Sequence, residues 1–165
     1  MKDEILEYHL NREKIFLIRN PISIKEARKG ITPVRLSTNK LTLIFVGRLV
    51  YQKGIDRILH LLAINKNIEL IIVGEGNVKS ELLKKAKHLN IENKIKFLGT
   101  ILNPYGLIAG SDYFILPSRW EGLPNCVLES LALGTPVLST KQIYSLNDFK
   151  ENITNKSIIL FNSIN

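Results

Sequence analysis

Two glutamates, Glu121 and Glu129, are separated by seven residues, and their spacing is the strongest chemical signal in the sequence. A Gly-Leu-Pro-Asn turn lies between them, and a helix-like run over 126–133 follows and stops at Gly134. Pro124 suits the first position of a helix, and Gly134 suits the position just past its end. One carboxylate then precedes a helix N-terminus and the other lies about a turn inside it, beside free backbone N–H groups that bind anions. A ligand with both phosphate and hydroxyl groups fits this arrangement, and a nucleotide sugar is such a ligand.

Cationic or glycine-containing turns follow the other apolar runs. Arg48 and Lys53 come after the run over 41–46, and a planar Arg fork with a Lys point charge suits two linked phosphates, although both also occur in ordinary strand–helix turns. The segment 74–77 (GEGN) would let a ligand approach the backbone, but it lacks the third glycine of the dinucleotide fingerprint, and a tight turn also explains it. The segment 99–101 is suited to hold a base through backbone groups.

Composition is that of a globular domain. The 165 residues are 45% hydrophobic, which is enough to bury the core of one domain. The net charge of +8 and the pI near 9.6 favour an anionic partner, but the basic residues are scattered as on a solvated lysine-rich surface, and we expect no nucleic-acid partner. The single cysteine, Cys126, rules out an intramolecular disulfide and favours a reducing compartment. The first ten residues do not look like a signal peptide and no apolar run reaches spanning length, so we expect a cytoplasmic protein.

The elements that must position these residues alternate between strand and helix patterns. Residues 20–40 contain Asn-Pro, Lys-Gly and Thr-Pro pairs and little apolar periodicity, which predicts a linker. We expect strands over 14–18, 41–46, 69–73, 95–98, 113–116 and 136–139, and helices over 2–11, 53–65, 78–89, 104–109 and 126–133. Such alternation predicts an α/β fold with a Rossmann-like, doubly wound parallel sheet. Because ligands lie over the carboxyl ends of the strands in such sheets, all the turns described above are expected at one edge.

The residues that carry these signals resemble the nucleotide-sugar domain of the retaining GT-B glycosyltransferases of family 4. The resemblance covers about residues 41–140 and rests on GRLVYQKG (47–54), IIVGEGN (71–77), FLG (97–99) and SDYFILPSRWEGLPNCVLESLALGTPV (111–137). Its last block, a Glu-x7-Glu motif within PSxxEG and followed by GTPV, is highly specific. The chain would then be the C-terminal half of a GT-B fold.

The resemblance implies a role for particular residues. Arg48 and Lys53 match the pair that grips the donor diphosphate, and Glu129 matches the glutamate that binds the ribose hydroxyls. Glu121 matches the catalytic glutamate near the transferred sugar, where it orients hydroxyls and stabilises positive charge at the anomeric carbon. The full set of implied donor-binding residues is Gly47, Arg48, Lys53, Gly99, Thr100, Ile101, Glu121, Gly122, Leu123, Pro124, Asn125 and Glu129. Because Arg, Lys and a helix N-terminus can take up the charge of the departing diphosphate, no metal and no other cofactor is expected.

The comparison also predicts a domain organisation. Asn20-Pro21-Ile22 resembles the segment that joins the two domains of this family, so residues 1–19 would be a remnant of the N-terminal acceptor domain, 20–40 the linker and 41–165 the donor-binding domain. After Thr140 the family usually continues with Gly-Pro-x-Glu and further helices, whereas this sequence continues differently and ends at residue 165. We therefore expect a donor-binding domain truncated at its C-terminus, from an excised domain, a split gene or a truncated frame. His9, His60 and His88 lie outside the expected site.

The function expected from the sequence is that of a hexosyltransferase donor domain. It would bind a nucleoside-diphosphate sugar for retaining transfer to a glycan or lipid-linked acceptor, in the cytoplasm or at the inner face of a membrane with which it associates peripherally. The acceptor-binding domain would lie in the parent chain or act in trans, and the isolated chain would be inactive. The alternatives are a non-catalytic nucleotide-sugar-binding subunit and another GT-B-like enzyme, such as a nucleotide-sugar epimerase, which lacks this glutamate motif.

Overall fold

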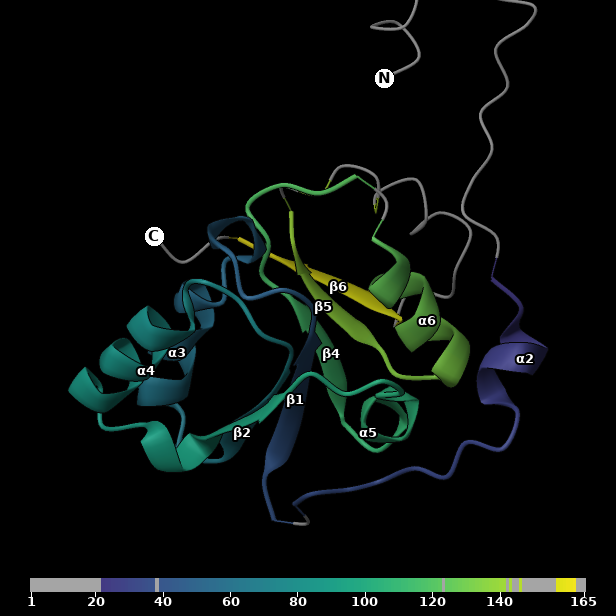
Figure 1. Cartoon of the computed structure of the whole chain (residues 1–165), viewed down its shortest axis with the longest axis horizontal. Coiled ribbons are helices and arrows are strands. Elements are labelled where there is room, and N and C mark those ends of the chain that lie inside the picture. The colour runs from purple at the N-terminus through teal and green to yellow at the C-terminus, as the bar shows by residue number, and fades with distance from the viewer. Residues whose placement is uncertain are drawn as a thin grey trace, which may run out of the picture.

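The computed structural model describes residues 22–37, 39–122, 124–141, 143, 146 and 157–162, and the structural statements below concern these residues. At its centre are six parallel strands: β1 Leu41–Val46, β2 Ile68–Val73, β3 Ile95–Gly99, β4 Tyr113–Leu116, β5 Val137–Thr140 and β6 Ile158–Phe161. Their order in the sheet is β3-β2-β1-β4-β5-β6 (Figure 1). This is the order of a doubly wound Rossmann-like sheet, and it confirms the predicted α/β fold class.

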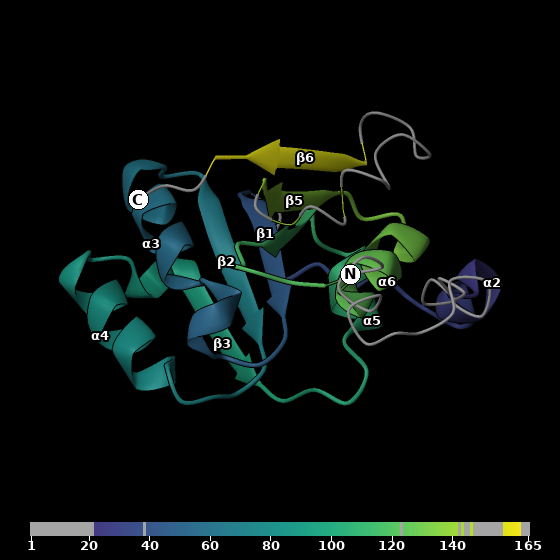
Figure 2. The same cartoon turned by 90° about the horizontal axis from the view of Figure 1, so that it is seen from above.

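Helices cover both faces of this sheet. The described helices are α2 Ile24–Arg28, α3 Asp56–Ile64, α4 Lys79–His88, α5 Tyr105–Ala109 and α6 Asn125–Leu133, with 3-10 turns η2 Tyr51–Lys53 and η3 Glu92–Lys94. Figure 2 shows α3 and α4 on one side of the strands, α5 and α6 on the other, and α2 beyond α6. The direction of winding therefore reverses between β1 and β4.

The continuous apolar run of β1 is explained by burial on both of its faces. Leu43 and Phe45 point into a core shared with α3 and α4, whereas Ile44 packs with Phe114 and with Val127 of α6. All five of these side chains are at most 1% exposed. A strand covered on both faces gains no benefit from alternating polar residues, so its sequence shows no period of two.

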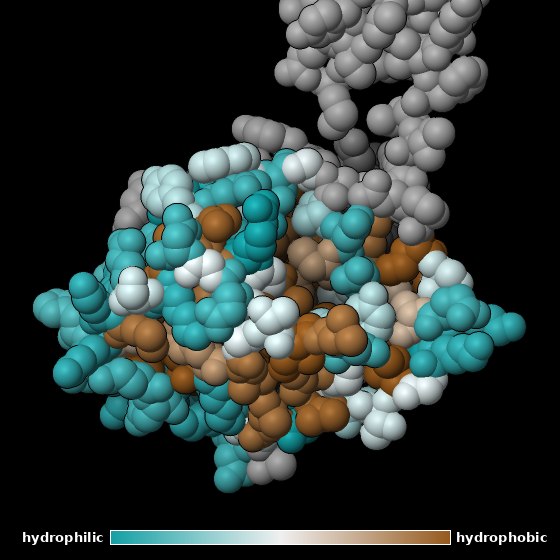
Figure 3. All heavy atoms as spheres, in the orientation of Figure 1, coloured by the Kyte–Doolittle hydropathy of each residue, from teal (hydrophilic) through white to brown (hydrophobic). Residues whose placement is uncertain are grey.

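The outer face of α4 carries lysines and also Leu83, which is 44% exposed. Lys84 and Lys87 are exposed, while Leu82 and Ala86 are at most 2% exposed on the inner face. Figure 3 shows hydrophilic side chains covering the region of α3 and α4, with apolar side chains gathered nearer the centre of this view.

Several predicted boundaries differ from the structure. The helix expected over 53–65 begins only at Asp56, because Gly54 takes a left-handed conformation (φ 64°) and ends η2 there. Pro124 is not the first residue of α6 but the capping residue before it, with an extended ψ of 122°, while Gly134 ends the helix as expected (φ 88°). The strand expected over 136–139 spans Val137–Thr140.

One α-helix and one strand of the described residues were not predicted. The helix α2 lies inside the expected linker, and β6 follows the region where no element was expected. The helix expected over 2–11 and the strand expected over 14–18 lie outside the described residues. The domain boundaries stay a prediction.

Candidate functional site

The carboxyl ends of β1 and β4 form the switch point of the sheet, where the chain leaves toward opposite faces. The strand β1 leads into Gly47 and Arg48, and β4 leads through Pro117 and Ser118 toward Glu121. In open α/β sheets this divergence creates the crevice in which ligands bind. Two of the turns expected to carry chemistry therefore meet at the switch point.

Lys53 and Glu121 form an ion pair at this point. Lys53 Nζ lies 2.6 Å from Glu121 Oε1, and the Ser118 hydroxyl donates to the same oxygen at 2.9 Å. The two charged side chains are only 15% and 9% exposed, so the pair is largely removed from water. One carboxylate oxygen thus accepts two hydrogen bonds from groups 68 and 3 residues away in the sequence.

A second ion pair fastens the loop after β4 to η2 and α3. Arg119 donates to both oxygens of Asp56, at 2.9 and 2.7 Å, and its guanidinium also donates to the Tyr51 carbonyl at 2.7 Å. The backbone N–H of Arg119 donates to the carbonyl of Gln52, and the Gln52 side chain donates to the carbonyl of Trp120. Burial opposes ionisation of Asp56, but the Arg119 guanidinium outweighs it and lowers the pKa of that carboxyl. We call these contacts the clamp, because they hold Lys53 and Glu121 face to face.

The close fit within the clamp depends on a glycine. A Cβ on Gly54 would lie 2.3 Å from the carbonyl oxygen of Pro117, closer than any two such atoms can approach. The positive φ of Gly54 is also strained for residues with a side chain. The η2–α3 turn can therefore lie against the end of β4 only with glycine at this position.

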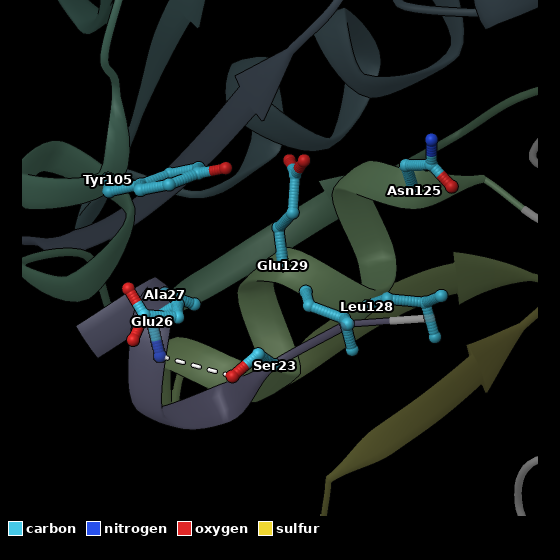
Figure 4. Close-up of a pocket in the computed structure, with 8 residues that line it drawn as sticks. Ser23, Glu26, Ala27, Tyr105, Asn125, Leu128 and Glu129 are labelled. Atoms are coloured by element: carbon cyan, nitrogen blue, oxygen red, sulfur yellow. Dashed lines mark hydrogen bonds between the residues drawn. The ribbon is translucent and has the colours of Figure 1, made fainter. Parts of the chain in front are cut away.

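A pocket of about 560 Å³ lies beside α6, between α2 and α5. Two predicted donor-binding residues, Asn125 and Glu129, line it together with Tyr105 of α5. Figure 4 shows the Tyr105 ring directed toward the Glu129 carboxylate, with the α2 residues Glu26 and Ala27 below the Tyr105 ring in this view. Burial and the neighbouring Glu129 carboxylate raise the pKa of the Tyr105 phenol, which therefore stays protonated at neutral pH and keeps a proton to donate.

The α2 wall of this pocket is fixed by contacts far apart in the sequence. Arg28 Nε donates to the Ala132 carbonyl at 2.6 Å, near the carboxyl end of α6, where a cation is favourable. The Val34 N–H donates to the Gly106 carbonyl at 2.8 Å. A Cβ on Gly110 would lie 2.2 Å from the Val34 carbonyl oxygen, so this segment lies tightly along α5.

Sequence reasoning missed both Tyr105 and the α2 residues of this pocket. A usable signal for α2 was present, because the Ser23 hydroxyl accepts a hydrogen bond from the Glu26 N–H and Ser-x-x-Glu is a capping pattern. Tyr105 follows Asn103-Pro104 in the loop after β3, on the edge where ligands were expected, but a single tyrosine carries no motif.

A smaller pocket of about 290 Å³ lies over the carboxyl ends of β1, β2 and β3. It brings together four predicted donor-binding residues, and Glu75 also lines it. These four residues are Gly47, Arg48, Thr100 and Ile101. The glycines of 74–77 serve the protein itself here, since a Cβ on Gly74 would lie 1.9 Å from the Gly47 carbonyl oxygen and one on Gly76 2.2 Å from that of Leu49. Close packing against the backbone that follows β1 therefore explains the two glycines, and neither of them lies in an assigned turn.

The remaining predicted donor-binding residues that the structure describes line neither of these two pockets. Gly99 ends β3 beside Glu75, Gly122 is exposed, Pro124 is buried and Leu123 lies outside the described residues. Cys126 lies among the charged groups of the site, but burial raises the pKa of its thiol to about 11, so it is an inert thiol at neutral pH.

Other features of the described residues bear on metals, histidines and membranes. His60 and His88 are exposed on α3 and α4, away from the pockets, and His9 lies outside the described residues. In the described part of the chain no group of three or more His, Cys, Asp or Glu side chains is arranged to hold a metal ion. Among the same residues no helix has the length and apolar character needed to cross a membrane.

Comparison with known families gives a match over most of the chain. The model of the family described as "Glycosyl transferases group 1" matches residues 28–164. A curated relative from Campylobacter jejuni, N-acetylgalactosamine-N,N'-diacetylbacillosaminyl-diphospho-undecaprenol 4-alpha-N-acetylgalactosaminyltransferase, is 31% identical over 144 residues, which are 85% of this chain and 38% of that protein. The lipopolysaccharide core biosynthesis glycosyltransferase LpsE of Rhizobium meliloti is 33% identical over 96 residues, which are 58% of this chain and 28% of that protein.

Solved structures share the fold. Anabaena HepE in complex with UDP-glucose superposes with a TM-score of 0.77 and 19% identity, covering 98% of this chain and 47% of that one. The lipopolysaccharide outer core galactosyltransferase WaaB superposes with a TM-score of 0.76 and 22% identity, covering 98% and 46%. The chain thus spans less than half the length of each of these proteins.

Proposed function

The chain belongs to the family of group 1 glycosyl transferases, and from this premise we propose that it binds a nucleoside-diphosphate sugar as the donor part of a retaining, family 4 hexosyltransferase. The observation that carries the proposal is the position of the Lys53–Glu121 pair. It lies at the switch point of the sheet, next in sequence to the two turns that frame the crevice, and both partners are largely buried. A cation for phosphate and a carboxylate for a sugar are thereby fixed within 2.6 Å of each other.

The two pockets supply the other contacts that such a donor needs. The pocket lined by Arg48, Thr100 and Ile101 offers backbone groups for a base and a guanidinium for phosphate. Glu129 accepts hydrogen bonds from the ribose hydroxyls, and the protonated Tyr105 phenol beside it orients its carboxylate. The anion-binding N-terminus of α6 lies between the two glutamates.

The charges of these groups also suit the chemistry of sugar transfer. As the bond between the anomeric carbon and the diphosphate breaks, negative charge grows on the phosphate and positive charge on the sugar. The negative charge on the phosphate is stabilised by Arg48, Lys53 and the start of α6. The positive charge on the sugar is stabilised by Glu121. When a phosphate engages Lys53, the lysine is drawn from Glu121, whose carboxylate then faces the sugar. No metal is required in this scheme, and an unchanged affinity for the donor in the presence of a chelator is the expected result.

The acceptor is proposed from the comparisons. The name of the Campylobacter relative specifies a saccharide on diphospho-undecaprenol, and that of the Rhizobium relative specifies lipopolysaccharide core biosynthesis. We propose a glycan or lipid-linked acceptor for this protein as well, met at the cytoplasmic face of a membrane through peripheral association. The net charge of +8 favours such an anionic surface.

Calorimetry with UDP, GDP and ADP and their sugars tests donor binding by this chain. We expect one nucleotide series to bind, with UDP the first candidate because the HepE complexes contain it. Changing Glu129 to Ala should weaken binding about 10- to 100-fold, the effect of losing hydrogen bonds to a charged group. No binding of any nucleotide would overturn the proposal, and transfer by the isolated chain would overturn the expectation that it needs an acceptor domain.

A further inference from the structure

We propose that Tyr51 and Trp120 form a sugar-binding subsite for the acceptor glycan, immediately outside the Lys53–Glu121 pair. The proposal rests on the donor-binding function proposed above. The two rings, which we call the aromatic corner, lie 6.2 Å apart between centroids with their planes inclined by 55°. They are large apolar side chains left open to solvent, since Tyr51 is 63% and Trp120 is 55% exposed.

The aromatic corner is held in place by the clamp. The Arg119 guanidinium carbon lies 3.8 Å from the centroid of the Tyr51 ring, so the guanidinium group covers one face of that ring. The same guanidinium is fixed by two hydrogen bonds to Asp56, and the carbonyl of Trp120 accepts a hydrogen bond from Gln52 at 2.9 Å. A preorganised aromatic surface loses little entropy on binding a ligand, which distinguishes it from a flexible exposed ring.

The position of the corner relates it to the reaction. Tyr51 is two residues from Lys53, so their Cα atoms lie within about 8 Å of each other, and Trp120 is next to Glu121, so their Cα atoms lie about 4 Å apart. Neither ring lines the pocket with Glu129 or the pocket with Arg48. A ligand on the corner therefore reaches the proposed sugar position from outside the donor pockets, as an acceptor must.

The chemistry of the corner matches a pyranose ring. Such a ring has an apolar face of C–H groups that packs on an aromatic face, and a rim of hydroxyl groups that needs polar partners. The Asp56 and Arg119 side chains beside the rings are polar and partly exposed, at 32% and 16%. An apolar surface bordered by charged groups suits a sugar better than an acyl chain, because an acyl chain has no hydroxyl groups to bond to the charged groups.

Trp120 is the single tryptophan of the chain, so its fluorescence reports on this site alone. The probes are methyl glycosides of glucose, galactose, N-acetylglucosamine and N-acetylgalactosamine, titrated to about 50 mM because an exposed stacking site is expected to bind in the millimolar range. We expect at least one glycoside to change the emission saturably, with UDP present and without it. No saturable change with any glycoside would overturn the proposal, as would displacement of the glycoside by UDP, which would place the sugar in the donor pockets.

Variants separate the corner from general surface effects. Ligand-observed NMR with the Trp120→Ala variant should show glycoside affinity at least about 5-fold weaker, with partial recovery in Trp120→Phe and UDP affinity unchanged. The control is Ile64→Ala, which removes an apolar side chain that is 79% exposed at the end of α3. Equal weakening in Trp120→Ala and Ile64→Ala, or a changed oligomeric state with unchanged glycoside affinity in Trp120→Ala, would overturn the proposal. Absence of UDP binding in the unaltered chain would instead overturn the donor function, because the glycoside titration does not depend on UDP.

Discussion

Lys53 Nζ lies 2.6 Å from Glu121 Oε1, so the cation proposed for phosphate and the carboxylate proposed for the sugar neutralise each other within the crevice. The pair is largely buried, and in such surroundings a single unpaired charge is costly. A donor that carries both a phosphate and a polarised sugar can give Lys53 the phosphate, and Glu121 the sugar, in place of the ion pair. The arrangement therefore favours a ligand that carries both groups over one that carries only one of them.

The first prediction concerns the neutralising effect of Glu121. Glu121→Gln removes the charge that competes with phosphate for Lys53 and keeps the shape of the side chain. We expect UDP to bind about 3- to 10-fold more tightly to this variant, the scale of one partly buried ion pair. Calorimetry with UDP measures this change. Weaker UDP binding by Glu121→Gln would show that the carboxylate does not restrain the lysine.

The second prediction concerns the contact between Tyr105 and Glu129. Tyr105→Phe removes the phenol hydroxyl that lies toward the Glu129 carboxylate and leaves the ring in place. We expect nucleotide affinity to fall about 3- to 10-fold, less than for Glu129→Ala, because the Glu129 carboxylate stays in place but loses the hydroxyl group beside it. The control is Tyr113→Phe, whose side chain lines a different pocket at the start of β4. Equal effects of the two changes would contradict a role for Tyr105 in positioning Glu129.

The third prediction concerns the close approach between Gly54 and Pro117. A methyl group on Gly54 would meet the Pro117 carbonyl at 2.3 Å and force a strained φ, so Gly54→Ala should lower the free energy of unfolding by about 2 to 4 kcal/mol. A Cβ on Gly122 meets nothing within 4 Å, so Gly122→Ala is the matched control and should change stability by less than about 1 kcal/mol. Denaturant unfolding measures both. Two variants of equal stability would disprove the contact.

The fourth prediction concerns the acid sensitivity of the clamp. The pKa of Asp56 is lowered from its ordinary 3.8, because Arg119 outweighs the opposing effect of burial. The contribution of the pair to stability is therefore present above pH 3.8 and is lost as the pH falls through the lower, folded-state pKa. Asp56→Asn should cost about 1 kcal/mol at pH 7 and flatten the loss of stability below pH 4. Parallel stability curves for the two proteins between pH 2 and 7 would contradict this.

Much of the framework was predictable because it depends on local patterns. The apolar run over 41–46 predicted a strand buried on both faces, and Gly134 predicted the end of α6. The positions of Glu121 before α6 and Glu129 within it also followed from the turn between them. The position of Arg48 at the carboxyl edge of the sheet was predictable from one rule, that the carboxyl ends of parallel strands lie at the same edge.

The rest depends on contacts between distant parts of the chain. The Lys53–Glu121 pair joins residues 68 apart, and no local pattern specifies which of several lysines meets the glutamate. The five residues of α2 are too few to show a period, and α2 is fixed by Arg28 at a carbonyl 104 residues away. Tyr105 lies in the site because α5 packs against α6. Such contacts appear only once the sheet has brought the segments together.

The most direct test of donor binding is a calorimetric titration with UDP. It compares the unaltered chain with the Lys53→Ala variant at the same salt concentration. We predict saturable binding to the unaltered chain and binding at least about 10-fold weaker to Lys53→Ala, because the lysine meets phosphate at the crevice between β1 and β4. The Lys84→Ala variant is the control, since Lys84 is an exposed lysine on the outer face of α4 and lines neither donor pocket. Equal UDP affinity in all three proteins, or no binding to any of them, would contradict the assignment of this crevice as the donor site.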